Sequence, residues 1–525
     1  MRLSSVATFQ TTAGRLVLGG AMTAAIAVTS ASAGAQTLTT AVTADPSMID
    51  PITYSELIAG DILGNVYEGF TAINADGDVV PALAESWEGH DDNLGFTFTI
   101  RQGVMTHLGN EFTAHDIKYT FEQLLIPDNR GGLNAEYLAP IVGAEAVIAG
   151  ETTELEGVTV VDDYTLEVRF TQPDVLFPIY PFYFMDDATA DLGEDWFLET
   201  SAGTGPFAFE TWERGQRVTL TAHADYWGEG PHIDGVEFLI VPSGDTMVSM
   251  FEAGELDLVY AEPAAIRRIL QTPELVEASL QVPAAQIRYL GMNQNLYEPF
   301  RDIRVREAIC IAFDRQAMVD GLFEGAAFPL AGQVTPGVAG FNPDLEVMPY
   351  DPERAQELLA EAGYPGGEGL PPIGITSTEQ NRNELLYFAS QFQQVLGMPV
   401  EVDVQERGTF IQGMNAGEVP FFPWGWSAGY PDALYFLSQV WYGPSPYNRA
   451  RWQNDEFDAL IEEAQGTADN EARYALYNEA ERILLEDFGT CPITVRMQVA
   501  LVADGVEGVR LTPFRFLPFN TVTMN

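Results

Sequence analysis

Residues 383–406 read NELLYFASQFQQVLGMPVEVDVQE, and this stretch sets a helical pattern directly before a strand pattern. Apolar residues in its first part recur at three or four positions, as on a helix with one buried face. Apolar and polar residues then alternate in VEVDV, as in a strand. Segments of these two kinds alternate from about residue 286 to residue 495, and this alternation predicts an α/β fold.

The chain has 525 residues, of which 46% are hydrophobic, and this length predicts two or three packed domains. Its first half is richer in short strands and turns, such as VTVVDDYTLEVRF at 158–170, with a helix expected at 114–125. A later helix has clear ends in DPERAQELLAEAGYP. There Asp351 is the expected cap, Pro352 the first helical residue and Gly363 the stop.

The first 35 residues have the pattern of a secretory signal peptide. Two arginines accompany an apolar run from Leu16 to Val28, and the small residues that follow suit cleavage after Ala33 or Ala35. The alternative is a membrane anchor, but the run is shorter than the roughly 20 apolar residues of a span. No cysteine follows directly, so we expect a soluble periplasmic protein that is not a lipoprotein.

The chain is strongly acidic, with 76 acidic and 25 basic residues and a formal net charge of −51. Binding to nucleic acid needs a basic face, so this class of partner is not expected. Only two cysteines occur. Cys310 and Cys491 could form a disulfide in an oxidising compartment, whereas the apolar run REAICIAF around Cys310 is also typical of an ordinary buried residue.

Residues 421–436, FFPWGWSAGYPDALYF, contain the spacing G-x-S-x-G around Ser427, which is found at the nucleophile of secreted hydrolases. In that hydrolase fold the histidine follows the serine, but all five histidines here precede Ser427. Pro420 and Pro423 also disfavour a buried central strand before it. None of the histidines has the i, i+4 spacing of a metal-binding helix, and we expect no catalytic, metal or cofactor site.

A binding role explains the same stretch better. Trp424, Trp426 and Tyr430 offer large faces for a ligand, and Asp432 and Arg449 offer charges. The alternative is that about half of these aromatic side chains belong to the core. This alternative is weaker for Trp426, which we expect in a loop.

Eleven stretches, in order and covering nearly all of the chain after residue 35, carry a family resemblance: ILGNVYEGF, PALAESWE, FTAHDIKYTFEQLL, GTGPFAFETW, HADYWGEGPHIDGVEF, MFEAGELDLV, YLGMNQN, PFRDIRVREAICIAFDR, DPERAQELLAEAGYP, WGWSAGYPDALYFL and NDEFDALIEEA. With these stretches the chain resembles the extracytoplasmic solute-binding proteins of ABC transporters, in the class that includes oligopeptide, dipeptide and nickel binders.

The resemblance implies a type II periplasmic-binding-protein fold of the α/β class, with two lobes, a hinge and an extra subdomain in lobe one. Lobe one would take residues 36–285, with the subdomain at about 86–200, lobe two residues 286–495, and residues 496–525 would return to lobe one. A monomeric, non-enzymatic receptor would close on a small solute, with a peptide favoured, and deliver it to a permease that an ATPase drives.

One departure from the family pattern concerns the ligand. Peptide-binding members carry an aspartate for the peptide's α-amino group at the position of Gly429, and Asp432 is the nearest substitute. Thr204, in GTGPF, is either a ligand contact or part of a structural turn. The ligand could also be a peptide held by another anchor, an opine-like compound or an oligosaccharide, and nickel is less favoured. Two alternatives to import are presentation of the ligand to a sensor and a secreted hydrolase that uses Ser427.

Overall fold

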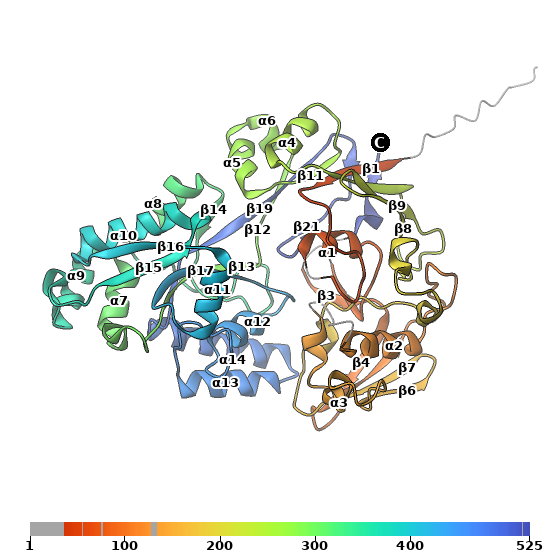
Figure 1. The fold of residues 1–525 in the computed structure, drawn as a ribbon, viewed down its shortest axis with the longest axis horizontal. Helices are drawn as coiled ribbons and strands as arrows, with labels where there is room; N and C mark the ends of the chain where they lie inside the picture. Colours follow the sequence, from red (N-terminus) through yellow and green to blue (C-terminus); the bar gives the residue numbers. More distant parts are fainter. Residues whose placement is uncertain (1–35, 55, 75–76, 128–133, 517) are drawn as a thin grey trace, which may run out of the picture. The chain divides into compact units, whose positions relative to one another are not determined.

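The computed structural model describes residues 36–525 except residues 55, 75–76, 128–133 and 517. The predicted signal peptide, residues 1–35, lies outside the described residues. Among the helices that are described, none combines the length and the apolar character needed to cross a membrane. Figure 1 shows the arrangement of the labelled elements.

The N-terminal strand opens a four-stranded sheet with the order β1-β10-β9-β8. Strand β1 pairs with β10 in parallel, and the other two pairings are antiparallel. The elements are β1 (Thr37–Val42), α1 (Leu57–Leu63), β8 (Phe207–Glu213), β9 (Arg217–Ala222) and β10 (Gly235–Ile240).

A second four-stranded sheet, with the order β4-β5-β7-β6, is entirely antiparallel and overlaps the predicted subdomain, with β4 beginning just before it at Ala84. Helix α2 begins with a capping box formed by Thr113 and Asp116, which satisfies backbone N–H groups at its start. The elements are β2 (Thr71–Ile73), β3 (Val79–Pro81), β4 (Ala84–Gly89), β5 (Gly95–Ile100), α2 (Ala114–Leu125), α3 (Ala144–Ile148), β6 (Val158–Asp162) and β7 (Thr165–Arg169).

The long strand β19 connects distant parts of the chain, because it pairs with β11, β12 and β14. Figure 1 shows helices α4, α5 and α6 next to β11. The elements are α4 (Gly244–Glu252), β11 (Leu258–Tyr260), α5 (Pro263–Gln271), α6 (Pro273–Glu277), β12 (Ser279–Pro283), β14 (Ala327–Pro329) and β19 (Thr494–Val502).

Between β12 and β19 the chain forms a three-stranded sheet, β17-β13-β18, a parallel pair, β15-β16, and most of the helices. The helix predicted between Asp351 and Gly363 is confirmed: Asp351 caps it, Pro352 is its first residue, and Gly363 follows its end with a φ of +97°. The elements are β13 (Gln286–Met292), α7 (Ile303–Ile311), α8 (Arg315–Met318), α9 (Pro352–Glu361), β15 (Ile373–Thr378), α10 (Arg382–Leu396), β16 (Val400–Gln405), α11 (Arg407–Ala416), β17 (Phe421–Ser427), α12 (Leu434–Phe436), α13 (Asp455–Gln465), α14 (Asn470–Glu486) and β18 (Cys491–Pro492).

In the described part of the chain, buried apolar residues form four clusters. The first core joins the two N-terminal sheets and includes a group of phenylalanines, in which the rings of Phe70 and Phe98 stack with centroids 4.0 Å apart. The C-terminal residues Val506, Phe519 and Val522 also belong to it. The second core packs around β17 and α14, the third around α7 and α10, and the fourth around α4 and α5.

The two cysteines form a disulfide that joins α7 to β18 within the third core. Both are fully buried, so the apolar surroundings of Cys310 correctly predicted burial but gave no sign of its partner. The sequence left open whether the cysteines form a disulfide or Cys310 is an ordinary buried residue, and the structure shows the disulfide.

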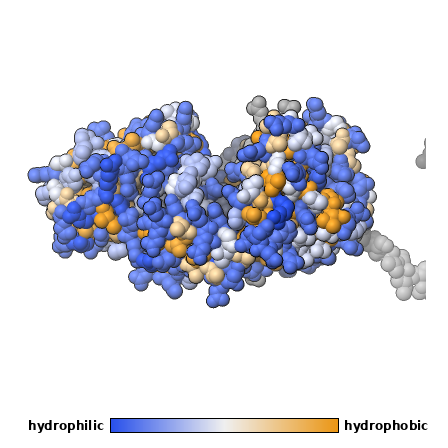
Figure 2. Space-filling view, turned by 90° about the horizontal axis from the view of Figure 1, so that it is seen from below, coloured by the Kyte–Doolittle hydropathy of each residue, from blue (hydrophilic) through white to orange (hydrophobic). Residues whose placement is uncertain are grey.

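Short segments complete the C-terminal part: β20 (Val506–Glu507) pairs with β23 (Thr523–Met524), and β21 (Leu511–Thr512) with β22 (Arg515–Phe516). Figure 2 shows one face of the molecule, on which hydrophilic residues predominate and hydrophobic residues form separate patches. This hydrophilic face agrees with the excess of carboxylates in the sequence.

Candidate functional site

Strand β17 carries both tryptophans of the predicted binding segment. It pairs with β13, so that Trp424 lies opposite Tyr289 and Trp426 opposite Ile287. Because side chains alternate along a strand, the two tryptophans share a face, and both pack against the second core. The expectation that Trp426 lies in a loop is wrong. Strand β17 accommodates Pro423 because it lies at the edge of its hydrogen-bonded sheet, where a missing N–H is tolerated.

Arg449 lies among aromatic rings on that face. Its guanidinium carbon is 5.0 Å from the ring centroid of Trp424, 5.4 Å from that of Trp426 and 6.0 Å from that of Tyr447. These distances are within the range of cation–π attraction. The Nε of Arg449 donates to Oδ1 of Asn415 at 2.9 Å. Burial lowers the pKa of Arg449 from its ordinary value.

Three donor groups in this cluster have no hydrogen-bond partner in the described part of the chain. They are the indole N–H groups of Trp424 and Trp426 and the Nη1 group of Arg449, and all three nitrogen atoms are buried. Buried polar groups in native proteins nearly always bond to protein, water or ligand. The cluster can therefore still donate to an acceptor from outside the chain.

Tyr430 and Gly429 lie in a group of tyrosines. The ring of Tyr430 is 5.0 Å from that of Tyr180 and 4.9 Å from that of Tyr435. A Cβ atom placed on Gly429 would lie 3.0 Å from Oη of Tyr137 and 3.1 Å from a ring carbon of Tyr435. These distances are tighter than ordinary contacts, so an aspartate at position 429 would require these tyrosine side chains to move by a few tenths of an ångström.

Asp432 is fully enclosed and already paired. Arg473 donates to its Oδ2 at 3.1 Å, and the backbone N–H of Leu434 donates to its Oδ1 at 3.0 Å. The Asp432 side chain is 1% exposed. These contacts favour a structural ion pair over a free carboxylate that could replace the missing one at position 429.

Thr204 joins a different cluster, centred on Glu68. Its hydroxyl donates to Oε2 of Glu68 at 2.8 Å, and the same carboxylate accepts from Tyr226 Oη at 3.0 Å and Trp227 Nε1 at 2.8 Å. Thr204 is fully buried. The three motifs NVYEGF, GTGPF and HADYW therefore meet at one carboxylate, and the contacts of Thr204 do not connect it to residues 421–449.

Ser427 does not have the surroundings of a nucleophile. Its hydroxyl accepts a hydrogen bond from Nε2 of Gln286 at 3.0 Å, across the β13–β17 pair. All five histidines lie in the described part of the chain, and none of their hydrogen bonds reaches Ser427.

Three of the predicted ligand contacts line three separate cavities, whereas the other four, Trp426, Gly429, Arg449 and Thr204, line none of these three. Asp432 contributes to one of about 710 Å³, together with Trp87, Leu176 and Tyr474. Tyr430 contributes to one of about 190 Å³. Trp424 and Ser427 contribute to one of about 270 Å³, which is also lined by Gln286, Arg288, Gln380, Asn381, Arg407, Gly425 and Arg496.

Sequence reasoning missed the arginines of this third cavity and the tyrosines around Gly429. Arg288, Arg407 and Arg496 come from β13, α11 and β19, so no local motif connects them. The one available signal was a charged residue inside an otherwise apolar strand, as Arg288 is in QIRYLGM.

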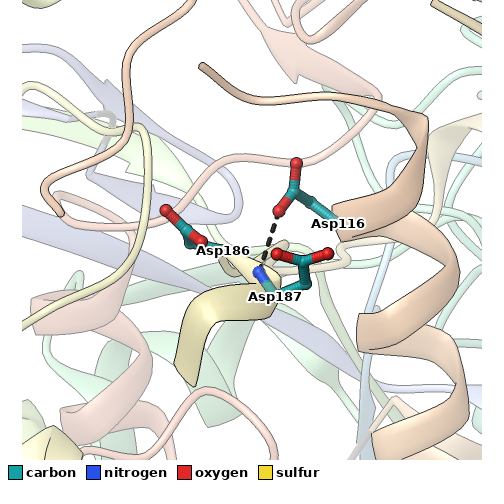
Figure 3. Close-up of side chains that lie close together, drawn as sticks. All are labelled: Asp116, Asp186 and Asp187. Atoms are coloured by element: carbon teal, nitrogen blue, oxygen red, sulfur yellow. Dashed lines mark hydrogen bonds between the residues drawn. The ribbon is translucent and has the colours of Figure 1, made fainter. Parts of the chain in front are cut away.

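Three aspartates lie close together near the start of α2: Asp116, Asp186 and Asp187. Figure 3 shows the backbone N–H of Asp187 donating to Asp116, at 2.8 Å. Asp186 accepts from the hydroxyl of Thr106 at 2.6 Å, and Asp116 accepts from the backbone N–H of Thr113. Asp116 thus caps helix α2, and the other bonds hold the neighbouring loops in place, so the cluster has a structural explanation.

Buried carboxyl groups predict that stability falls as pH rises. Glu481 in α14 accepts backbone N–H groups from Gln333 and Val334, yet burial raises its pKa from 4.5 to about 7. Burial, with smaller contributions from Asp187 and Asp186, raises the pKa of Asp116 from 3.8 to about 6. Because the folded state keeps these protons to higher pH than the unfolded chain does, their stabilising effect is complete below about pH 4 and is lost between pH 4 and about pH 7.

We therefore expect a higher urea midpoint at pH 5 than at pH 8. The change Glu481→Gln keeps the Oε1 acceptor and removes the ionisation, so it should stabilise the protein at pH 8 and flatten the profile. Glu471→Gln, at an exposed position on the same helix, is the matched control. A Glu481→Gln profile parallel to that of the wild type would contradict this assignment.

Comparison with known proteins gives one consistent family. Residues 78–448 match the model of the bacterial extracellular solute-binding proteins, family 5 middle region. Heme-binding protein A of Haemophilus influenzae is 29% identical over 471 residues, covering 85% of this chain and 84% of that protein. Dipeptide-binding protein DppE of Bacillus subtilis is 28% identical over 504 residues, covering 92% of this chain and 90% of that protein.

Solved structures agree on the fold. The unliganded open form of the periplasmic murein tripeptide-binding protein MppA superposes with a TM-score of 0.82 at 24% identity, covering 94% of this chain and 98% of that one. HbpA2 from Haemophilus parasuis gives a TM-score of 0.81, also at 24% identity, covering 93% of this chain and 100% of that one. The predicted two-lobe α/β fold is thus confirmed, and the chain belongs to family 5 of the bacterial extracellular solute-binding proteins.

Proposed function

We propose that this protein binds a small solute, most simply a peptide, between its two lobes and delivers it to the permease of an ABC importer. Relatives named for dipeptides, glutathione and heme support the capture of a small solute. One observation indicates where the solute binds: Trp424, Trp426 and Arg449 each have a buried donor group without a hydrogen-bond partner in the described chain. Carbonyl and carboxylate oxygens of a solute are the acceptors that these donors require.

The finer features belong to the same proposal. We infer lobe one at residues 36–285 and 496–525, with its subdomain at about 86–200, and lobe two at residues 286–495. The membership of Val506, Phe519 and Val522 in the first core supports the return of the C-terminal segment to lobe one. We also infer secretion through a signal peptide without a lipid anchor, a periplasmic monomer, and no nucleic-acid partner.

The experiment that tests the function is a thermal-shift screen of the purified protein against dipeptides, tripeptides, glutathione, opines and sugars. The expected result is stabilisation by one class of solute, which is recovered chemically unchanged. The Ser427→Ala variant should still be stabilised by that class of solute. Hydrolysis of a solute that Ser427→Ala abolishes would overturn the proposal.

Trp426 provides the sharpest test of where the solute binds. We expect Trp426→Ala to raise the dissociation constant of the solute found in the screen at least about tenfold, or about 1.4 kcal/mol, because the indole supplies contact area and a free donor. Isothermal titration calorimetry measures this. Trp212→Ala removes an indole that is bonded to Asp45 and stacked with Arg214, and it should leave the affinity unchanged. An unchanged affinity in Trp426→Ala would make Trp426 a core residue only.

A further inference from the structure

The cavity of about 270 Å³ beside β17 is positively charged although the chain carries a net charge of −51. Arg288, Arg407 and Arg496 line it, and no aspartate or glutamate of the described chain does. All of its lining residues lie between positions 286 and 496. Strands β13 and β19, together with the start of α11, therefore bring three cations to one cavity.

Only one of the three arginines has a carboxylate partner. Arg288 is paired with Glu384, and its Nε donates to Oε1 of Glu384 at 2.8 Å. The side chains of Arg407 and Arg496 make no ion pair and no hydrogen bond with any residue that the structure describes. In a chain with about three acidic residues for each basic one, surface arginines such as Arg217 and Arg482 pair with carboxylates. Arg407 and Arg496 are instead among the described arginines that lack such a partner, and both line this one cavity.

The electrostatics of Arg496 favour an added anion. Burial lowers the pKa of Arg496, and the nearby Arg288 lowers it further, whereas Glu384 acts in the opposite direction. An anion placed against Arg496 and Arg288 would offset the repulsion between these two cations. Guanidinium groups bind carboxylate oxygens with two parallel N–H bonds, a geometry that an ammonium group does not offer.

The remaining lining groups suit the rest of a small organic acid. Gln286 and Ser427 offer an amide and a hydroxyl that bond to each other at 3.0 Å. Strand β17 therefore carries residues of this cavity as well as Trp424, whose ring lies beside Arg449 in the cluster of free donors. A volume of about 270 Å³ is at the lower end for small-molecule sites, so the cavity fits one end of a solute.

We propose that Arg407 and Arg496, supported by Arg288, form an anion subsite that holds a carboxylate group of the transported solute. This rests on the proposed function and narrows the solute to a carboxylic acid. It also gives the solute an anchor in place of the one that the crowded position 429 lacks. A peptide with a blocked amino end would then bind, whereas a neutral sugar would not.

The test uses matched pairs of solutes, each offered as the free acid and as the carboxamide. Suitable probes are trialanine, N-acetyl-trialanine and glutathione with their C-terminal amides, titrated calorimetrically into the purified full-length protein at constant chloride. We expect binding of the acids and at least about thirtyfold weaker binding of the amides. Equal affinity for an acid and its amide would overturn the subsite.

The double variant Arg407→Gln/Arg496→Gln should weaken acid binding at least about a hundredfold and make the acid and its amide bind alike. The control, Arg301→Gln/Arg510→Gln, removes the same charge at two exposed positions that form no ion pair, and should change the affinity less than threefold. Circular dichroism and melting temperatures check folding. An acid-to-amide ratio that survives the double variant would contradict the proposal.

If none of these probes binds, mass spectrometry is used to identify the solute that co-purifies with the protein from its host. A carboxylic acid there supports the subsite, and its affinity is then compared in the two double variants. A neutral or cationic solute overturns the subsite but leaves the proposed function intact. A protein that carries no solute and binds none would contradict both.

Discussion

Replacing both Cys310 and Cys491 by alanine is expected to lower the free energy of unfolding by about 5 kcal/mol. The disulfide closes a loop with a sequence separation of 181 residues, and the loss of chain entropy in the unfolded state grows with the length of the closed loop. Both cysteines are fully buried in the third core, so alanine also removes packing there. The midpoint of guanidinium denaturation, followed by circular dichroism, measures the effect.

Reduction of the wild-type protein provides the control, because it opens the bridge without removing atoms from the core. The reduced protein should lose nearly as much stability as the double variant does. Equal midpoints for the oxidised and the reduced protein would contradict a stabilising bridge. A stabilising disulfide also agrees with the extracellular setting of the family, where disulfides persist.

The change Glu68→Ala is expected to cost about 3 to 5 kcal/mol of stability. It leaves the donors of Thr204, Tyr226 and Trp227 without their acceptor, and each unsatisfied buried donor costs about 1 to 3 kcal/mol. Arg101, whose guanidinium carbon lies 4.4 Å from the ring centroid of Trp227, would also lose a nearby negative charge. Denaturation midpoints measure the loss.

Two variants make this prediction specific. Glu68→Gln keeps one oxygen acceptor, so we expect it to lose less stability than Glu68→Ala. Glu229→Ala removes a carboxylate at an exposed position nearby in sequence to Tyr226 and should leave the midpoint unchanged. A Glu68→Ala protein as stable as the Glu229→Ala protein would show that the three donors find water instead.

Local patterns in the sequence predicted much of the fold. The helix at α9 followed from its cap, its proline and its glycine, and the hairpin of β6 and β7 followed from an alternating pattern around a turn. These signals act over one helical turn or one strand, so neighbouring residues contain them. Strand β17 was harder to predict, because its glycine and its proline argue against a strand that pairing with β13 nevertheless stabilises.

The candidate site was predictable only in part. The sequence indicated an aromatic segment around Trp426 and the absence of a carboxylate at Gly429, and both are properties of single positions. It did not indicate that Asp432 forms an ion pair with Arg473 or that the Thr204 hydroxyl donates to Glu68. Nor did it indicate that Trp441 is fully buried in the second core. Those outcomes depend on which partner each side chain meets after distant segments pack.

By itself, the sequence determined the α/β class, the acidic character and the family pattern, because composition, period and motif order are carried along the chain. Only the tertiary structure decided that Cys310 meets Cys491, that two tyrosines crowd Gly429, and that Arg288, Arg407 and Arg496 share a cavity. The physical reason is that strand pairing and core packing bring together residues from separate elements, and no local pattern records which of them will meet.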